Sequence, residues 1–186
     1  MESLPFRRND RSHLPHRAHV AIRVESHYKA SPQRVFDAWL DPDIARRWLF
    51  ATATRPIAHV EIDARVAGRF RFVEQPETGD VEHRGEYAEL APHRRLVFTL
   101  ALAGRRRSGT RVIVEIESRA RGCDLALTHE DLPLDLAHAM EARWTGILYG
   151  LGVTLDSNRS ESAIERLQFA RRGPLRRPPL GEGRLP

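Results

Sequence analysis

Between residues 57 and 130 the chain carries six consecutive segments in which apolar and polar residues alternate. Alternation with a period of two is typical of β-strands that bury one face. Short turn-like stretches, such as Gly79-Asp80 and Arg121-Gly122, separate several of the segments. Short connections favour antiparallel pairing, because parallel strands need long crossovers. We therefore predict an antiparallel meander with strands at residues 57–63, 68–73, 81–90, 95–102, 110–117 and 123–130.

One strand and two short helices are predicted ahead of this meander. Residues 19–29 alternate in the same way as the later segments. Ser31-Pro32 and Asp41-Pro42 each place an N-cap residue before a proline, and proline is favoured at the first position of a helix. Because apolar residues at helical spacing follow each pair, we predict two short helices directly after the first strand.

A long amphipathic helix is predicted after the meander, from Asp135 to about residue 156. Its apolar stripe has the spacing i, i+4, i+7 and i+11, which places one face of the helix against a core. The residues of this stripe are Trp144, Leu148, Leu151 and Leu155. Residues 160–169 have the pattern of one further short helix.

Charge divides the chain into three parts. Residues 1–18 carry a net charge of +2 and residues 159–186 a net charge of +4, which leaves −1 for residues 19–158 out of the total of +5. We predict a flexible N-terminal arm at residues 1–18, one folded ligand-binding domain at residues 19–157, and a basic, mostly disordered tail at residues 158–186. Because the folded part is nearly neutral, we expect no sequence-specific binding to nucleic acid.

Several sequence features bear on the cellular location and on metals. The single cysteine, Cys123, excludes an internal disulfide, which fits a reducing compartment. Met1–Arg17 has charges and prolines where a signal peptide needs an apolar stretch, and no apolar run approaches the length of a membrane span. We predict a cytoplasmic protein without membrane insertion. His13, His16 and His19 are spaced by three, but a proline interrupts them and no cysteine is near, so we predict no metal site and no cofactor.

Three stretches together carry a family signature, and they occur in the family's order: Ser31–Pro42 followed by Arg47-Trp48, Gly85–Pro92 with Arg95–Thr99, and Leu125–Glu130 with the later Trp144. They resemble the Hsp90-ATPase-activator-like (AHSA1-type) family, which is part of the SRPBCC superfamily of START-like and Bet v 1-like proteins. The resemblance covers about residues 20–156. It implies an α+β helix-grip fold, in which a seven-stranded curved antiparallel sheet wraps around a long C-terminal helix and leaves a cavity between them.

The resemblance also limits the functions that we expect of this chain. Members and cousins of the family bind lipids or other apolar molecules, and some cyclase and hydrolase relatives catalyse reactions. The co-chaperone members carry an additional N-terminal domain that contacts Hsp90. We expect this chain to lack that domain and therefore not to activate Hsp90, and we treat a homodimer as compatible with the sequence.

The candidate pocket residues are aromatic or apolar side chains that a helix-grip fold directs inward, together with one histidine. Large apolar residues at regular spacing serve either as plain core or as a cavity wall, and the sequence leaves both interpretations open. The charged strand residues Arg69, Arg71, Arg84 and Glu86 are expected on the outer face, in cross-strand ion pairs. The predicted pocket consists of Trp39, Trp48, Phe70, Phe72, Phe98, His129, Trp144 and Leu148.

Three functions fit these features. The first is the binding or carriage of a small hydrophobic molecule between the sheet and the long helix, in a stress-related role and without catalysis. The second is a cyclase-like or hydrolase-like enzyme with His129 as acid or base in an apolar cavity. The third is a chaperone-linked interaction protein without a ligand. His129 also fits a purely structural role, because no partner carboxylate is evident from the spacing.

Overall fold

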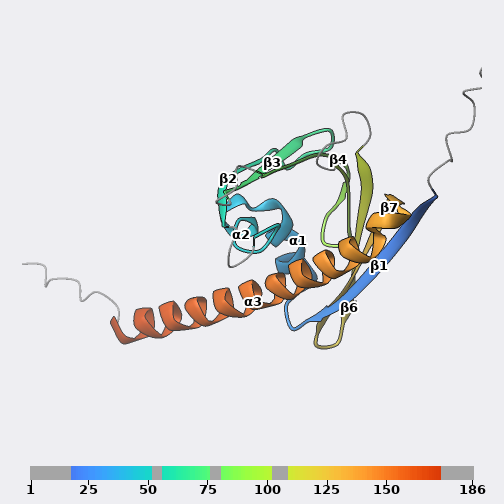
Figure 1. Cartoon of the computed structure of the whole chain (residues 1–186). Helices are drawn as coiled ribbons and strands as arrows, with labels where there is room; N and C mark the ends of the chain where they lie inside the picture. The colour runs from blue at the N-terminus through green and yellow to red at the C-terminus, as the bar shows by residue number, and fades with distance from the viewer. Residues whose placement is uncertain (1–17, 52–55, 76–80, 102–108, 173–186) are drawn as a thin grey trace, which may run out of the picture.

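The computed structural model describes residues 18–51, 56–75, 81–101 and 109–172, with side chains up to residue 157. The described residues form seven strands and three helices, in the order of one strand, two short helices, six strands and one long helix. Figure 1 shows their arrangement. Their bounds are β1 (His19–Tyr28), α1 (Pro32–Leu40), α2 (Pro42–Ala45), β2 (Ile57–Ile62), β3 (Arg69–Glu74), β4 (Val81–Ala91), β5 (Arg95–Leu100), β6 (Thr110–Arg119), β7 (Gly122–Pro133) and α3 (Leu134–Arg172).

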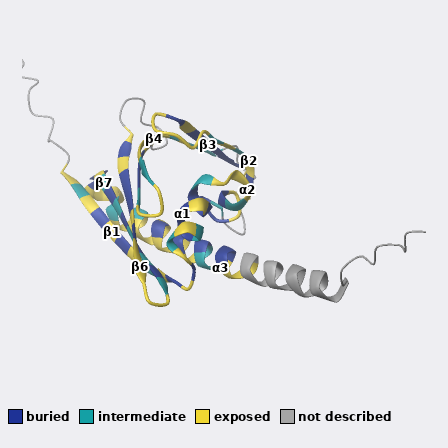
Figure 2. Cartoon of the chain, turned by 180° about the vertical axis from the view of Figure 1, so that it is seen from behind, coloured by how far each residue is buried: buried dark blue, intermediate teal, exposed yellow. Residues whose placement is uncertain are grey.

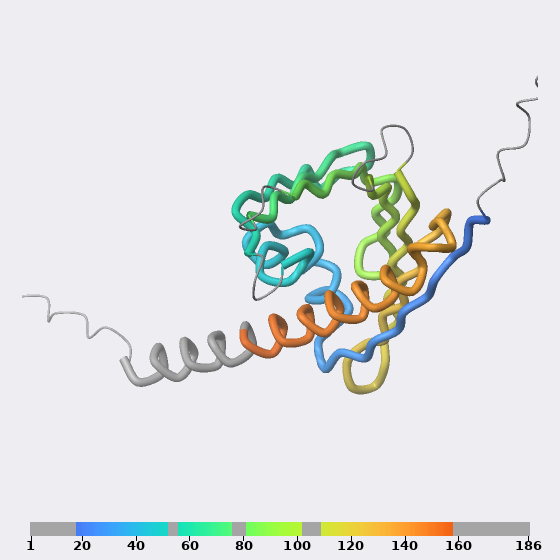
Figure 3. Tube along the Cα trace, in the orientation of Figure 1, coloured from blue at the N-terminus to red at the C-terminus, as the bar shows by residue number. Residues whose placement is uncertain are grey.

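The seven strands form one antiparallel sheet in the order β1-β7-β6-β5-β4-β3-β2. Strands β2 to β7 are therefore the predicted meander, and β1 pairs with β7 at the far edge. The sheet curves over α1 and α2, and α3 lies along the open side of the curve (Figure 3). This arrangement confirms the predicted class, an α+β fold with a curved sheet around a long C-terminal helix.

The two short helices begin where their caps predict. The Ser31 hydroxyl accepts a hydrogen bond from the backbone N–H of Arg34 at 3.3 Å, and Pro32 is the first residue of α1. The Asp41 carboxylate accepts from the N–H groups of Asp43 and Ile44 and caps α2. These caps satisfy N–H groups that the start of a helix leaves unpaired, so they stabilise both short helices. The two helices lie between β1 and β2 in the chain and occupy the hollow of the curved sheet.

The long helix ends later than predicted. α3 continues to Arg172 without a break, so the predicted end at about residue 156 and the separate helix at residues 160–169 are wrong. Part of the predicted tail, residues 158–172, is helical. The physical reason is local: the chain has no proline between Pro133 and Pro174, and the helix ends just before Gly173-Pro174, a pair that stops a helix.

One face of α3 closes the core. Trp144, Ile147, Leu148, Leu151 and Leu155 are buried at helical spacing, as the apolar stripe predicts. Figure 2 shows the buried residues of α3 facing the sheet and the exposed ones facing solvent. Among the described residues, no helix is long and apolar enough to cross a membrane.

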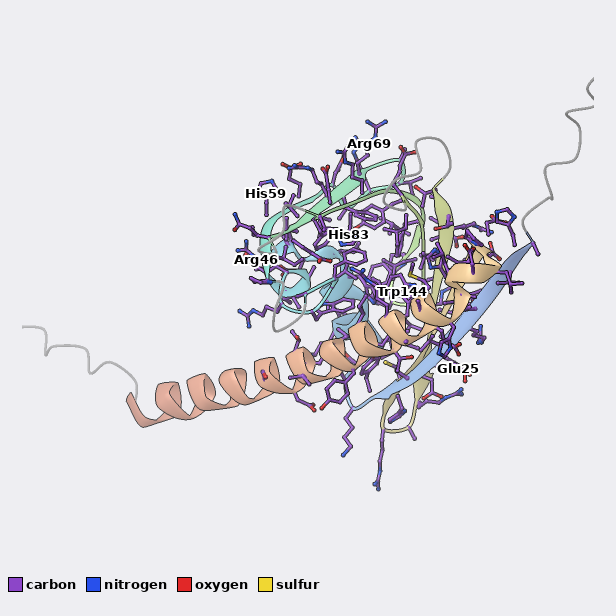
Figure 4. All side chains as sticks on the ribbon, in the orientation of Figure 1. Glu25, Arg46, His59, Arg69, His83 and Trp144 are labelled. Carbon is purple, nitrogen blue, oxygen red and sulfur yellow. The ribbon has the colours of Figure 1, made fainter. Side chains whose placement is uncertain are left out.

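The outer face of the sheet carries the predicted ion pairs. Arg69 lies opposite Glu86 in the β3–β4 register, with 3.4 Å between Nε and the carboxylate. Arg71 and Arg84 both bind the carboxylate of Glu82. These side chains point away from the core, so the charged strand residues named above serve the solvated face, as Figure 4 shows for Arg69.

Gly85 allows two strands to pack closely around Phe70. A Cβ atom at residue 85 would overlap the Thr99 carbonyl oxygen and the edge of the Phe70 ring. We predict that Gly85→Ala lowers the free energy of unfolding by about 1–3 kcal/mol or more, because backbone atoms cannot move aside. Gly146→Ala is the matched control, since a Cβ there meets nothing within 4 Å and alanine should stabilise the helix by about 0.5–1 kcal/mol. Denaturant unfolding measures both, and an unchanged stability of Gly85→Ala would contradict the packing described here.

Candidate ligand-binding site

A cavity of about 230 Å³ lies between the first four turns of α3 and the adjoining ends of β4 and β5. Helix α3 contributes one stripe to its wall at the spacing i, i+4, i+7, i+8 and i+11, and the sheet contributes the opposite wall. All lining residues are apolar except a histidine and an arginine. They are Phe50, Val81, His83, Leu100, Ala101, Leu136, Met140, Arg143, Trp144 and Ile147.

The two polar lining residues belong to a cluster that joins three elements. Glu74, the last residue of β3, is only 1% exposed. Its Oε1 accepts hydrogen bonds from His83 Nε2 on β4 at 2.6 Å and from Arg143 Nη2 on α3 at 2.8 Å. The sheet register brings the first two together, because His83 lies opposite Phe72, two residues before Glu74. The buried carboxylate thus fixes the positions of both polar groups in the cavity wall.

The Phe50 ring packs against both polar side chains of this cluster. The His83 ring stacks on it with 4.2 Å between centroids, and the Arg143 guanidinium carbon lies 6.0 Å from its centre. The backbone of Phe50 has φ of 64°, in the left-handed region that bulky residues avoid. Such a conformation costs roughly 1–3 kcal/mol and is found most often at functional sites. The strained backbone directs a large aromatic ring into the cavity wall.

The surroundings of His83 favour the neutral form of its imidazole. Burial is the main cause that lowers the pKa of His83, and the nearby Arg143 charge lowers it further, although the hydrogen bond to Glu74 opposes both. Because Nε2 carries the hydrogen that is donated to Glu74, Nδ1 is the acceptor nitrogen of the ring. The described residues provide no hydrogen bond to this Nδ1.

His129 has a different role from the one that a catalyst needs. Trp144 Nε1–H donates to His129 Nδ1 at 2.9 Å, so the remaining proton is on Nε2, which donates to the Thr110 hydroxyl at 2.6 Å. That hydroxyl donates in turn to the Leu100 carbonyl. Burial lowers the pKa of His129 to about 4. Both ring nitrogens are occupied, and His129 is not among the residues that line the cavity.

Five of the eight predicted pocket residues pack against one another as core. Trp39 and Trp48 meet edge to face at 4.7 Å, and Phe70 meets Phe98 at 5.4 Å. Phe72 contacts the Phe50 ring. None of the five is more than 5% exposed or lines the cavity. Side chains of this kind fill the hollow of the sheet, so their role is packing, and a ligand contact for them stays a prediction.

Trp144 and Leu148 face separate openings. Trp144 lines the cavity described above. Leu148 contributes instead to a groove of about 530 Å³ between α3 and the end of β1. The Tyr28 hydroxyl crosses the base of that groove and donates to the Leu148 carbonyl at 2.8 Å. Of the eight predicted residues, Trp144 is the one found in the lining of the 230 Å³ cavity, and a pocket role for the other seven stays a prediction.

Sequence reasoning missed Glu74, His83 and Arg143. The sequence indicates two of them as inward-facing. Glu74 follows Phe70 and Phe72 at a spacing of two, so it shares their side of the strand. His83 shares a strand face with the buried Tyr87. Figure 4 shows His83 inside the curve of the sheet, while His59 lies on its outer side. The described residues contain no group of three or more His, Cys, Asp or Glu side chains placed to hold a metal ion.

The comparisons with known proteins agree with this geometry. The model of the family "Activator of Hsp90 ATPase homolog 1-like protein" matches residues 29–156. The chain belongs to this family. Membership confirms the resemblance found in the sequence and places the cavity inside the matched region. No curated protein matches the sequence significantly.

Three solved structures share the fold of this chain. The AHSA1-like protein of Aeromonas hydrophila is 23% identical, with a TM-score of 0.66 over 75% of this chain and 94% of that protein. A Staphylococcus aureus protein of unknown function is 19% identical, with a TM-score of 0.69 over 77% and 97%. The Aha1 dimer of Colwellia psychrerythraea is 18% identical, with a TM-score of 0.59 over 72% and 93%. These likenesses show the helix-grip fold.

The buried, neutral His129 predicts an acid-sensitive stability. An unfolded histidine binds a proton near its ordinary pKa of 6.5, whereas the folded one does so only near 4. The unfolded state therefore binds more protons between these values, and stability is lost as the pH falls from about 6.5 to about 4, by up to roughly 3 kcal/mol. His129→Gln keeps an acceptor for Trp144 and a donor for Thr110 but cannot titrate. We expect a shallower pH dependence of its unfolding free energy, and equal slopes for both proteins would contradict this assignment.

Proposed function

We propose that this domain binds a small, largely apolar molecule in the cavity between α3 and the ends of β4 and β5. The observation that carries the proposal is a cavity whose wall is apolar except for one buried, hydrogen-bonded cluster. Ligand sites in proteins have this composition, with a hydrophobic lining and a few convergent polar groups that orient the ligand. The family fold is compatible with such binding.

The size of the cavity limits the ligand. A cavity of roughly 150 Å³ is large enough for benzene, so 230 Å³ suits one aromatic ring with a short substituent or a branched chain of similar bulk. A long-chain lipid would need more room. Carriage or sequestration of a compact hydrophobic molecule is therefore favoured over transfer of a membrane lipid.

Binding is favoured over catalysis by His129. A general acid or base needs a free nitrogen within reach of the substrate, and both nitrogens of His129 are bonded inside the core. The other expectations from the sequence stay predictions: a cytoplasmic location, a stress-related role, a homodimer and no activation of Hsp90. The Colwellia psychrerythraea protein was solved as a dimer, which makes a dimer worth testing here.

A variant that fills the cavity tests the proposal. Met140 lies in the lining and is only partly buried, so Met140→Trp should occupy the space without breaking the core. We expect it to weaken binding of toluene and indole by at least about tenfold, measured by ligand-observed NMR. Ala142→Trp is the matched control, because Ala142 is an exposed residue of the same helix that lines neither this cavity nor the groove beside Leu148.

The control should bind both probes as the natural protein does. Equal binding by Met140→Trp and the natural protein would move the site elsewhere, for example to the groove beside Leu148. No binding of either probe to the natural protein would contradict a small-molecule cavity.

A further inference from the structure

Glu74 and His83 form a carboxylate–imidazole pair in the cavity wall. Glu74 Oε1 lies 2.6 Å from His83 Nε2, and Glu74 is buried. The side chain of His83 is 12% exposed and lines the cavity. A buried carboxylate that accepts from one ring nitrogen fixes the tautomer and the orientation of the imidazole. General bases in enzymes are commonly held in this way, by a third group that orients them.

The other nitrogen of the His83 ring has the lone pair that a base needs. Because Nε2 carries the hydrogen that is donated to Glu74, Nδ1 is the acceptor nitrogen, and no described residue forms a hydrogen bond with it. His129 differs, since both of its ring nitrogens are bonded inside the core. Burial is the main cause that lowers the pKa of His83, which favours the unprotonated ring.

Arg143 places a cation beside this base in the same wall. Its Nη2 donates to Glu74 Oε1 at 2.8 Å and lies 3.3 Å from His83 Nε2. A guanidinium has N–H groups on three nitrogens, and the contacts of Arg143 with described polar side chains use Nη2. A cation that is held in place stabilises negative charge that develops on a nearby oxygen, and it does so more strongly in an apolar site than in water.

A base and a cation in an apolar cavity are the two groups needed to remove a proton from a carbon next to a carbonyl group. The base takes the proton, and the cation stabilises the oxygen of the enolate that forms. The lining residues of the cavity include no Ser, Thr or Cys. Acyl transfer through a covalent intermediate on such a nucleophile is therefore disfavoured.

We propose that the cavity catalyses proton transfer at the α-carbon of a small aryl ketone, with His83 Nδ1 as the base, an N–H group of Arg143 at the enolate oxygen and Glu74 as the positioning residue. The C–H bond breaks, its electron pair enters the enolate, and the proton moves to Nδ1. The imidazolium donates to Glu74 and then returns a proton to carbon, so the reaction needs no oxidant or co-reactant. This inference rests on the binding function proposed above and adds a reaction to it.

Hydrogen–deuterium exchange of phenylacetone tests the proposal. This ketone has one aromatic ring, a short substituent and a methylene group next to its carbonyl, so it suits the size of the cavity. In heavy water the full-length protein should exchange the methylene protons at least about a hundredfold faster than free imidazole at equal concentration, as followed by NMR. Binding of phenylacetone is measured separately by saturation-transfer NMR.

Two variants assign the residues of the pair. His83→Gln keeps a donor for Glu74 but has no base, so exchange should fall at least about a hundredfold while the affinity for phenylacetone changes less than about threefold. Glu74 from β3 raises the pKa of His83, and Arg143 from α3 lowers it. Glu74→Gln should therefore weaken the base, slow exchange by about tenfold and move the acid limb of the pH–rate profile to lower pH.

The matched control is a second histidine–carboxylate pair outside the cavity. His59 and Glu61 on β2 are also 2.6 Å apart, but both are exposed and neither lines the cavity. Figure 4 shows His59 on the outer side of the sheet. His59→Gln should therefore leave the exchange of phenylacetone unchanged.

The outcomes separate the reaction from the binding. Binding of phenylacetone without accelerated exchange would overturn the catalytic inference and leave the binding function standing, and absence of both would count against both. Accelerated exchange that His83→Gln retains would place the base elsewhere and overturn the inference. A slower Glu74→Gln variant with an unshifted pH–rate profile would show that Glu74 only supports the fold, which would overturn its positioning role.

Discussion

The structure depends on how the apolar face of α3 closes the concave side of the sheet. Trp144 is the key side chain in this contact, because it is both buried packing and the donor to His129. The chain of hydrogen bonds from Trp144 through His129 and Thr110 to the Leu100 carbonyl links α3 to β7, β6 and the end of β5. Every polar atom in this chain is satisfied, so it stabilises one register of helix against sheet. The cavity and its polar cluster lie along the same contact of α3 with the sheet.

Two histidines at this interface have opposite roles because their neighbours differ. His129 lies among neutral partners, and burial alone keeps it uncharged. His83 lies between a carboxylate and a guanidinium at a cavity wall, where burial and the Arg143 charge lower its pKa and the hydrogen bond to Glu74 raises it. Position along the strands decides this difference: His129 sits in a central strand under the helix, whereas His83 sits near the start of β4, where the sheet opens. A polar residue at the open end of a curved sheet is placed to contact a ligand, whereas one beneath the helix stabilises the fold.

Much of the fold was predictable because it depends on short-range patterns. Period-two alternation gave the strands, and Ser31-Pro32 and Asp41-Pro42 gave the two short helices. The end of α3 was harder, because only Gly173-Pro174 marks it and the weak pattern after residue 156 suggested a break. The site could not be found in the same way. Trp39 and Phe98 in the core are of the same residue types as Phe50 and Trp144 at the cavity, and spacing does not distinguish them. Glu74, His83 and Arg143 are far apart in sequence and meet only through the register of β3 with β4 and the docking of α3.

The central claim is that the partly open, mainly apolar cavity with one polar cluster in its wall is a site for a small molecule. Native mass spectrometry of the full-length protein as purified tests it most directly, followed by denaturation and analysis of any released compound. The account predicts a fraction of the protein with added mass that corresponds to one compact, mainly apolar molecule, and its loss in the Met140→Trp variant. A long-chain lipid as the released compound, or an added mass that Met140→Trp retains in full, would contradict it.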